Sequence, residues 1–292
     1  MELVKKTNIN FMGHRKVAYT LSFLLVVIAL VSMFSVGLNY GVDFAGGLLL
    51  QYSFQQPVTV DEIRATLTEI GLGESIIQSF AEDEVVVRTS LLPEEERAAM
   101  RTALEESFGP VNVVRIEEVG PAIGADLRRM GVFALLLAIG GILVYVSLRF
   151  EFRPAVTSII ALAHDGFVVL GILTLLQREF SIPVLAAVLT ILGYSINDSI
   201  VIMDRVRENF SLHRRTSITD LLNKSLNETF SRTVNTTLTT LLPVLALLFF
   251  GGRMLQDFSL TMFIGLLVGT YSTIFITGAI LVDWEKRKPL RR

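Results

Sequence analysis

Six long stretches of almost uninterrupted apolar residues divide the 292-residue chain. A helix needs about 20 apolar residues to cross a bilayer, and each stretch is close to that length or longer. The first stretch has a longer apolar core than a secretory signal, and no small-x-small cleavage site follows it, so we expect it to be retained. The pattern predicts six transmembrane helices, at residues 17–37, 131–148, 156–176, 184–203, 233–251 and 258–282.

A different pattern fills residues 38–130, where short strand-like runs alternate with helical ones. Thr59 is a candidate N-cap for the first of these helices and Gly71 ends it. Pro93 and Gly109 bound the second. The order β-α-β-β-α-β is that of a ferredoxin-like split βαβ unit. Strands are expected at 48–54, 75–80, 85–89 and 111–117, and helices at 61–70 and 93–108.

The fold class predicted by both patterns is an α-helical polytopic membrane protein with an α+β ferredoxin-like domain between its first two spans. Only 18% of the residues are charged and 51% are apolar, whereas about a quarter are charged in soluble domains. There is no cysteine, which excludes thiol nucleophiles, Cys-based zinc sites and disulfide scaffolds. We therefore expect no metal, no cofactor and no ordinary cytosolic enzyme, and we interpret 38–130 as an interaction or lever domain.

The basic residues predict the orientation in the membrane. Four segments hold 17 of the 26 Lys and Arg residues, whereas the short connections 177–183 and 252–257 hold one each. We expect these four segments to be cytoplasmic: the N-terminus 1–16, the turn 149–155, the loop 204–232 and the basic tail 283–292. Residues 38–130 would then be periplasmic, in a bacterial inner-membrane protein with both termini in the cytoplasm.

The basic cytoplasmic residues fit this topology and contact with anionic membrane lipid. The examples are Arg214, Arg215 and the tail from Lys286 to Arg292. Nothing in the sequence supports binding to nucleic acid.

Specific motifs lie at the borders of these segments. Gly41–Gly47 (GVDFAGG) follows the first span, and Val119–Pro121 leads back to the membrane. Gly193–Asn209 covers the end of the fourth span, and Ser231–Thr233 opens the fifth. With the one-plus-five layout of spans, the chain resembles the SecF branch of the SecD/SecF family, in the RND superfamily, over nearly its whole length.

This resemblance implies a role in bacterial protein export. Members act with SecD to help the SecYEG translocon, and SecA indirectly, move unfolded preproteins across the inner membrane by using the proton gradient. The second transport half is supplied by SecD on another chain. The resemblance also implies that Asp198 and Arg232, which match an Asp and an Arg of the family, take part in proton conduction. No hydrolytic reaction of its own is expected.

Asp198 is the sharpest single feature of the sequence. It lies six residues before Asp204, and so about 9 Å below the expected end of its span. An acid at that depth costs several kcal/mol unless it is protonated, paired or hydrated. The functional interpretation is a proton-relay carboxylate, and the alternative is a structural acid near the headgroups.

Arg232 is the candidate counter-ion of Asp198. The segment 204–232 is long enough to fold back as an amphipathic helix, which would bring the fourth and fifth spans side by side. The alternative role of Arg232 is that of a topological anchor. One flank of the following helix carries Thr236 and Thr239, and the other Thr233, Thr237 and Thr240. Such hydroxyls hydrogen-bond neighbouring helices or line a wire of waters.

Asp165 is the second relay candidate, about nine residues into the third span and next to His164. A midplane acid needs a partner or a proton, and the two side chains together form a possible proton shuttle. Two alternatives stay open: His164 as a neutral hydrogen-bonding core residue, and Asp165 in a structural pair with a hydroxyl of the fourth or fifth span.

Glycine-rich corners mark both borders of the 38–130 domain. They are interpreted either as hinges that transmit domain movement into the membrane or as rigid corners. The residues are Gly41, Asp43, Gly46 and Gly47 on the way out, and Gly120 and Pro121 on the return. Gly265 and Gly269 form a GxxxG pair, for which helix packing is the ordinary explanation.

Three other functions compete with export. An intramembrane aspartyl protease would use Asp165 and Asp198, but the Gly-x-Gly-Asp motif is missing before Asp198. Half of a small-molecule RND exporter would need a larger extracytoplasmic domain than the 38–130 segment. A purely structural assembly factor would not need Asp198.

Overall fold

The computed structural model describes residues 7–213, 216–252 and 255–287. Several basic residues used to predict the orientation lie outside these ranges, namely Lys5, Lys6, Arg214, Arg215, Arg253 and the tail 288–292. The chain forms two compact units, Met1–Asn39 with Ala134–Arg292, and Tyr40–Phe133.

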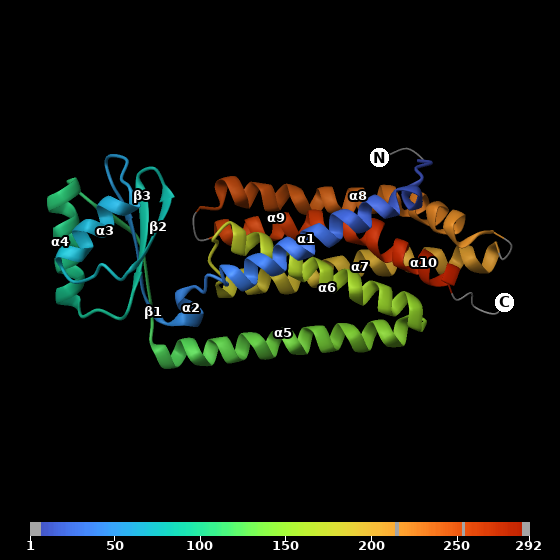
Figure 1. The fold of residues 1–292 in the computed structure, drawn as a ribbon, viewed down its shortest axis with the longest axis horizontal. Helices are drawn as coiled ribbons and strands as arrows, with labels where there is room; N and C mark the ends of the chain where they lie inside the picture. Colours follow the sequence, from blue (N-terminus) through green and yellow to red (C-terminus); the bar gives the residue numbers. More distant parts are fainter. Residues whose placement is uncertain (1–6, 214–215, 253–254, 288–292) are drawn as a thin grey trace. The chain divides into compact units, whose positions relative to one another are not determined.

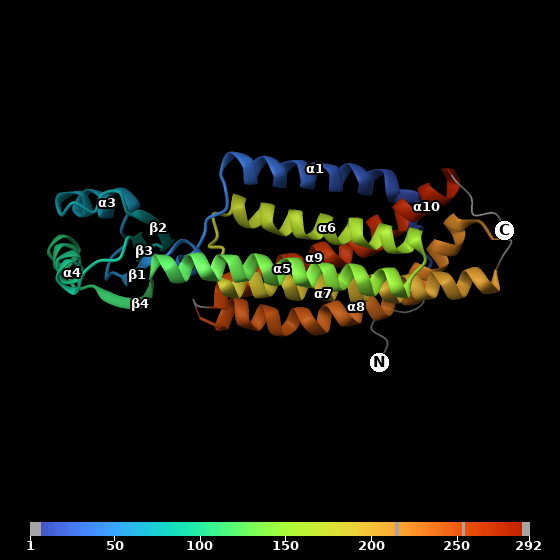
Figure 2. The same cartoon turned by 90° about the horizontal axis from the view of Figure 1, so that it is seen from below.

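The first unit is a bundle of long helices (Figures 1 and 2). Among the residues described, six helical stretches are long and apolar enough to cross a membrane, which confirms the six predicted spans. They consist of η1 (Phe11–His14) with α1 (Arg15–Ser35), α5 (Pro121–Arg149), α6 (Phe152–Leu175), α7 (Ile182–Leu212), α8 (Ile218–Phe250), and α9 (Gln256–Ser272) continued by the π-helical turn η3 (Thr273–Thr277) and α10 (Gly278–Arg287).

The segment 204–232 does not form a separate amphipathic helix. Instead, α7 continues to Leu212 and α8 already begins at Ile218. Ser217 caps α8 by accepting a hydrogen bond from the backbone N–H of Asp220. The two helices therefore form a long hairpin, and Asp198 lies near the middle of α7 rather than near its end.

Helix α7 packs against α6, α8 and α9, while α1 packs on α6. The helices α1 and α6 approach closely at Gly171 of α6, where an added Cβ would lie 2.2 Å from the Cβ of Ala29 on α1. Ser32 of α1 also donates a hydrogen bond to the carbonyl of Gly171, at 3.2 Å. Small residues thus bring these two backbones together.

Ion pairs join helices at the end of the bundle where α1 begins and α10 ends, which we call the terminal end. They connect α1 to α10, α6 to α10, α5 to α7 and α7 to α8. The pairs are Arg15–Asp283 (3.1 Å), Arg153–Glu285, Arg149–Asp204 (2.6 Å) and Arg205–Glu228 (2.7 Å).

The second unit is a four-stranded antiparallel sheet with two helices. Its elements are β1 (Gly47–Ser53), α3 (Val60–Glu69), β2 (Ile76–Ala81), β3 (Glu84–Thr89), α4 (Glu94–Phe108) and β4 (Asn112–Val119), preceded by the short α2 (Val42–Ala45). The strand order β2-β3-β1-β4, with α3 and α4 on one face (Figure 1), confirms the predicted ferredoxin-like fold.

The register of the sheet places a single apolar core under the two helices. Leu50 of β1 pairs with Val87 of β3, and both pack with Ile63 of α3 and Leu104 of α4. On the opposite face, Leu49 and Val86 form a smaller cluster with Val42 of α2. The alternation of side chains along each strand thus separates the two clusters.

A capping box begins α3, as the Thr59 position predicts. The Glu62 carboxylate accepts hydrogen bonds from the backbone N–H and the hydroxyl of Thr59, at 2.9 and 2.8 Å. The Thr59 hydroxyl oxygen accepts one from the Glu62 N–H, at 3.3 Å. The hydrogen bonds from Thr59 lower the pKa of Glu62 below its ordinary value.

We predict that Glu62→Gln destabilises this domain at neutral pH but not at low pH. Because the pKa of Glu62 is lowered by folding, its stabilisation is present above its unfolded-state pKa, roughly 4.3, and disappears as the pH falls through the folded-state value. The domain has its own core, so we expect residues 38–126 to fold alone. Thermal unfolding of this fragment at pH 7 and pH 3 provides the measurement, with Glu69→Gln in the same helix as control. An equal loss at both pH values would contradict the prediction.

Candidate functional site

Asp198 on α7 faces α8 within the bundle. Its Oδ1 accepts a hydrogen bond from the hydroxyl of Thr233, at 2.9 Å. Its Oδ2 is buried and has no hydrogen-bond partner among the residues that the structure describes. One carboxylate oxygen is therefore held in place, while the other is left to take a proton or a water.

Arg232 precedes Thr233 on α8, but its side chain is exposed. Within the described ranges it forms no ion pair with Asp198, although its charge acts on that carboxyl. The direct contact to α8 is thus made by a hydroxyl, and the guanidinium acts from a longer distance.

Hydroxyl groups continue from Asp198 along the interface of α8 with α7 and α9. Thr237 lies one turn beyond Thr233, and its Oγ1 is 2.9 Å from that of Thr270 on α9. The Tyr194 hydroxyl of α7 donates to Thr237, at 3.1 Å. In contrast, Thr239 bonds back to the backbone of its own helix. Of the predicted threonine stripe, Thr233 and Thr237 therefore join α8 to its neighbours in the described structure.

Asp165 on α6 is fully buried, with 0% of its surface exposed. Its Oδ1 lies 3.0 Å from Nδ1 of His164. Its Oδ2 accepts hydrogen bonds from the hydroxyls of Ser195 on α7, at 2.5 Å, and Ser272 on α9, at 2.8 Å. Ser195 fits the alternative in which Asp165 pairs with a hydroxyl of the fourth span, whereas Ser272, on the sixth span, was not expected. Ser195 lies in the motif around Asp198, but nothing in the sequence pairs Ser272 with Asp165.

Helix α7 connects the two carboxylates, since Ser195 and Asp198 lie one turn apart on it. Ser199, in the next turn, is 3.3 Å from Thr273 across the interface, measured between the hydroxyl oxygens. Thr273 begins the π-helical turn η3. Such turns are frequent at functional sites because they disturb the regular hydrogen bonds of a helix. The carboxylates and this irregular turn thus occupy the same level of the bundle.

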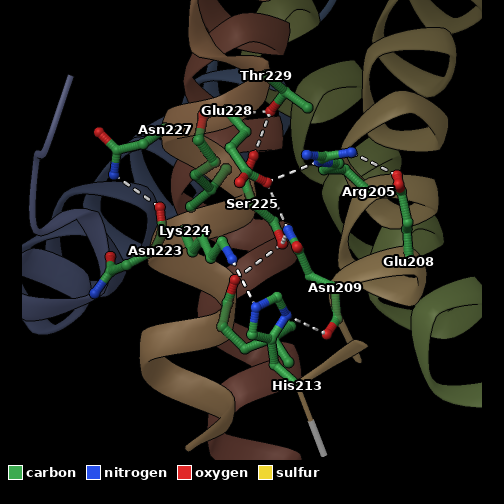
Figure 3. A network of polar contacts seen from close by, with 12 residues as sticks. Arg205, Glu208, Asn209, His213, Asn223, Lys224, Ser225, Asn227, Glu228 and Thr229 are labelled. Carbon is green, nitrogen blue, oxygen red and sulfur yellow. Dashed lines mark hydrogen bonds and ion pairs between the residues drawn. The ribbon is translucent and has the colours of Figure 1, made fainter. Parts of the chain in front are cut away.

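A second polar network holds α7 and α8 together at the terminal end (Figure 3). Asn209 is buried and donates from Nδ2 to Ser225, at 3.0 Å, and to Glu228, at 2.7 Å. Glu228 also pairs with Arg205. Farther out, Lys224 lies 3.0 Å from Nε2 of His213. This network aligns the hairpin in which Asp198 meets Thr233.

The two glycine corners of the other unit contact each other. Gly46 has φ 74° and an added Cβ would lie 3.0 Å from Cα of Pro121, at the start of α5. An added Cβ on Gly47, which has φ 118°, would lie 2.6 Å from the carbonyl oxygen of Thr89. Only glycine fits both positions. Gly124 of α5 approaches equally closely, because its Cβ would lie 2.8 Å from the Gly46 nitrogen.

The remaining corner residues surround this contact. Gly41 caps α2, whose first turn contains Asp43, and Gly120 precedes Pro121 at the start of α5. The two corners predicted separately therefore form one structure, made of α2 and the beginning of α5.

The glycines of α9 pack against α7. An added Cβ on Gly265 would lie 2.1 Å from Cδ1 of Ile191, and one on Gly269 would lie 3.3 Å from Cβ of Ser195. This agrees with the packing interpretation of the GxxxG pair. It also shows that Gly269 leaves space for the contact between Ser195 and Asp165.

Comparison with protein families matches two models to this chain. Residues 99–287 match the model "Protein export membrane protein SecD/SecF, C-terminal", and residues 31–58 match the "SecD/SecF GG Motif". The chain belongs to the SecD/SecF family. The GG motif of the family contains the Gly46–Gly47 corner described above.

Relatives in the SecD/SecF family cover nearly the whole chain. Protein translocase subunit SecF of Desulfurispirillum indicum is 45% identical over 290 residues, covering 96% of this chain and 92% of the relative. SecF of Pseudomonas aeruginosa is 43% identical over 282 residues, with the same coverage. SecDF of Thermus thermophilus is 44% identical over 286 residues, covering 96% of this chain but 39% of the relative.

Solved structures of the SecD/SecF family have the same fold. The crystal structure of SecDF from Thermus thermophilus, a translocon-associated membrane protein, matches with a TM-score of 0.89 and 44% identity. The match covers 96% of this chain and 39% of that one, so this chain corresponds to about two fifths of SecDF. A structure of SecDF in a super-membrane-facing form matches with a TM-score of 0.73.

Membership of the SecD/SecF family also bears on the competing functions. The relatives are named as translocase subunits rather than as proteases or small-molecule exporters. Asp165 and Asp198 are not hydrogen-bonded to each other, and they use different partners on different helices. A protease dyad would instead require the two carboxylates to share a site.

Proposed function

We propose that this chain is a subunit of the bacterial protein-export machinery that uses the proton gradient to support late steps of preprotein translocation. The observation that carries this proposal is Asp198, a carboxyl within a membrane-spanning helix with one oxygen held by Thr233 and the other left without a protein partner in the described chain. Ionisable residues in such positions serve as proton relays or pair with one another. No hydrolytic reaction is proposed.

SecD is the proposed direct partner. In Thermus thermophilus, a single SecDF chain contains a region that is similar to this protein and makes up 39% of the SecDF length. The remainder of SecDF would correspond to a separate subunit here. The association of that SecDF with a translocon supports contact of this chain with the SecYEG translocon. We further propose that SecA acts indirectly and that the translocating unfolded preprotein contacts the ferredoxin-like domain.

The proposed proton path uses Asp198, Arg232 and Asp165. Asp198 takes up and releases protons, while Arg232 supplies a permanent charge, since a guanidinium does not release its proton. Each proton that crosses 100 mV releases about 2.3 kcal/mol, enough to change a two-state equilibrium by more than tenfold. The structure formed by the two glycine corners, at Gly46 and Pro121, is the proposed hinge. The ferredoxin-like domain would move about this hinge when the proton energy is released.

The proposal is tested by preprotein export into inverted inner-membrane vesicles that contain SecD. Adding this chain should increase export when a proton gradient is present, and an uncoupler should remove the increase. Export driven by ATP alone should be the same with and without the chain. If the increase survives the uncoupler in full, the chain assists export without using the gradient.

The proposed orientation places the ferredoxin-like domain in the periplasm and both chain ends in the cytoplasm. Its support is the concentration of 17 of the 26 basic residues in the four segments 1–16, 149–155, 204–232 and 283–292. The proposed location is the bacterial inner membrane.

We predict that a membrane-impermeant maleimide labels Ser90→Cys but not Ser211→Cys in cells with a permeabilised outer membrane. Both serines are exposed, and the chain contains no native cysteine to give a background. Ser211 becomes reactive only after the inner membrane is opened, which serves as the control. Labelling of position 211 alone in sealed cells would show the opposite orientation.

A further inference from the structure

His164 of α6 is buried in the bundle, with 7% of its surface exposed. Its Nδ1 is paired with Oδ1 of Asp165, at 3.0 Å. Its Nε2 is buried as well and has no hydrogen-bond partner in the described part of the chain. A buried polar atom without a hydrogen-bond partner destabilises the fold, so its presence calls for an explanation. The contact with Asp165 uses only one of the two ring nitrogens, and Nε2 stays available to bind a proton.

The surroundings of His164 are polar, and the charged side chain that contacts its ring is Asp165. From α9, Tyr271 faces the imidazole, with the ring centroids 6.3 Å apart. The Tyr271 hydroxyl is occupied, since it donates to the carbonyl of Ala18 and lies 3.0 Å from the Ser22 hydroxyl of α1. The helix α7 contributes Ser195, which reaches Asp165 rather than the imidazole. Nothing among these groups supplies a proton to Nε2.

We propose that His164 delivers protons to Asp165, so that the two side chains form one proton-binding unit into which protons pass through Nε2. This rests on the proposed function. A proton arriving from water binds Nε2, and the proton on Nδ1 moves to Oδ1 of Asp165. The result is a neutral imidazole with its proton on Nε2 and a neutral carboxylic acid, so one proton has been added to the pair. Release runs through the same steps in reverse.

Protonation of Asp165 in this way changes the contacts between helices. Hydrogen bonds to a charged carboxylate are roughly twice as strong as those to a neutral acceptor. The Asp165 carboxylate holds Ser195 of α7 and Ser272 of α9, so adding a proton weakens two helix contacts at once. Since Ser272 directly precedes the π-helical turn η3, the change acts where the span is least regular. The proton on His164 and Asp165 is thereby linked to the packing of α6 against α7 and α9.

The test is His164→Asn. The asparagine Nδ2 replaces Nδ1 as a donor to Asp165, but there is no second nitrogen through which a proton can pass. We expect the variant to assemble with SecD and its gradient-dependent export to fall at least about tenfold. The reason is that a positioned proton shuttle contributes roughly 10²–10⁴-fold to the rate of a proton-transfer step. His14→Asn, the same change at an exposed helix N-cap, should keep the wild-type response to the uncoupler.

Infrared spectroscopy of the chain in liposomes gives a second readout that does not depend on export. The C=O band of protonated Asp165, assigned by its loss in Asp165→Asn, should titrate over a pH range at least about one unit away from wild type in His164→Asn. A structural role alone would leave both the titration and the export response as in wild type, and that result would overturn the inference. If His164→Asn keeps gradient-dependent export while Asp198→Asn loses it, the inference fails and the proposed function stands. If both variants keep it, the proposed function fails.

Discussion

Asp198→Asn is expected to abolish the gradient-dependent part of preprotein export while the subunit still assembles with SecD. Asparagine keeps the shape of the side chain and an oxygen that can accept the hydrogen bond from Thr233, whose hydroxyl lies 2.9 Å from Oδ1 of Asp198. It cannot bind and release a proton. Because the loss concerns the proton and not the packing, we expect the uncoupler-sensitive increase in export to fall by roughly 10²-fold or more. Export into inverted vesicles with and without an uncoupler measures it.

Two further positions separate the proton from the hydrogen bond at this site. Thr233→Val removes the hydroxyl that holds Oδ1 but leaves the carboxyl, so it should reduce the gradient-dependent export less than Asp198→Asn. Arg232→Lys keeps a positive charge and should retain part of the activity, whereas Arg232→Met should retain little. ATP-driven export should persist in all of them. An undiminished uncoupler response in Asp198→Asn would make Asp198 structural and leave Asp165 as the relay.

Gly171→Ala is expected to destabilise the bundle, although alanine is the better helix former. An added Cβ would lie 2.2 Å from Cβ and 2.4 Å from Cα of Ala29, so helix α1 must move away from α6 as a whole. The shift also strains the hydrogen bond from Ser32 to the Gly171 carbonyl. Overpacking of this kind costs about 1–3 kcal/mol, which thermal unfolding of the detergent-solubilised protein would detect.

Gly140→Ala on α5 is the matched control for this prediction. Apart from its own helix backbone, no heavy atom of the described chain lies within 4 Å of an added Cβ there, so only the gain in helix propensity, about 1 kcal/mol, remains. The two variants should therefore change stability in opposite directions. If Gly171→Ala is as stable as Gly140→Ala, then α1 is not seated as closely on α6 as the structure indicates.

The fold was largely predictable because its signals are local. Apolar runs of membrane-spanning length mark the six helices, and Thr59, Gly71 and Gly109 mark the helix ends of the ferredoxin-like domain by capping and by positive φ. The length of α7 and α8 was less predictable. Their extensions beyond the apolar runs are polar, and they are helical because Asn209 and Glu228 bond across the hairpin, a contact that no local pattern reveals.

The candidate site was predictable in its charged members and in the threonine flank with Thr233 and Thr237, but the individual hydroxyl partners could not be assigned from the sequence. Asp165 and Asp198 stand out as acids in apolar stretches, but their hydroxyl partners are ordinary serines and threonines of membrane helices. Ser272 is 107 positions from Asp165, so only the fold brings them together. The sequence led us to expect an interaction between Asp198 and Arg232. The charge of Arg232 does act on Asp198, but within the described residues the two side chains form no ion pair, because the adjacent Thr233 is buried against Asp198 while Arg232 is exposed.

The glycine positions show the same limit. GxxxG spacing identifies Gly265 and Gly269, yet a comparably close helix contact uses Gly171 together with Ala29, and these two residues share no motif. Close approach depends on which small residues face each other across the interface. Spacing along one helix cannot supply that information.

Two ion pairs at the terminal end join the last helix, α10, to helices that are synthesised much earlier. The last helix, α10, carries Asp283 and Glu285, the partners of Arg15 on α1 and Arg153 on α6. During synthesis, both arginines therefore lack these carboxylate partners until α10 has been made, and α1 is joined to α6 by packing and by the hydrogen bond from Ser32 to the Gly171 carbonyl. A chain cut short before Asp283 would leave both guanidinium groups without these carboxylates, so the contacts that join α10 to α1 and to α6 would be lost together.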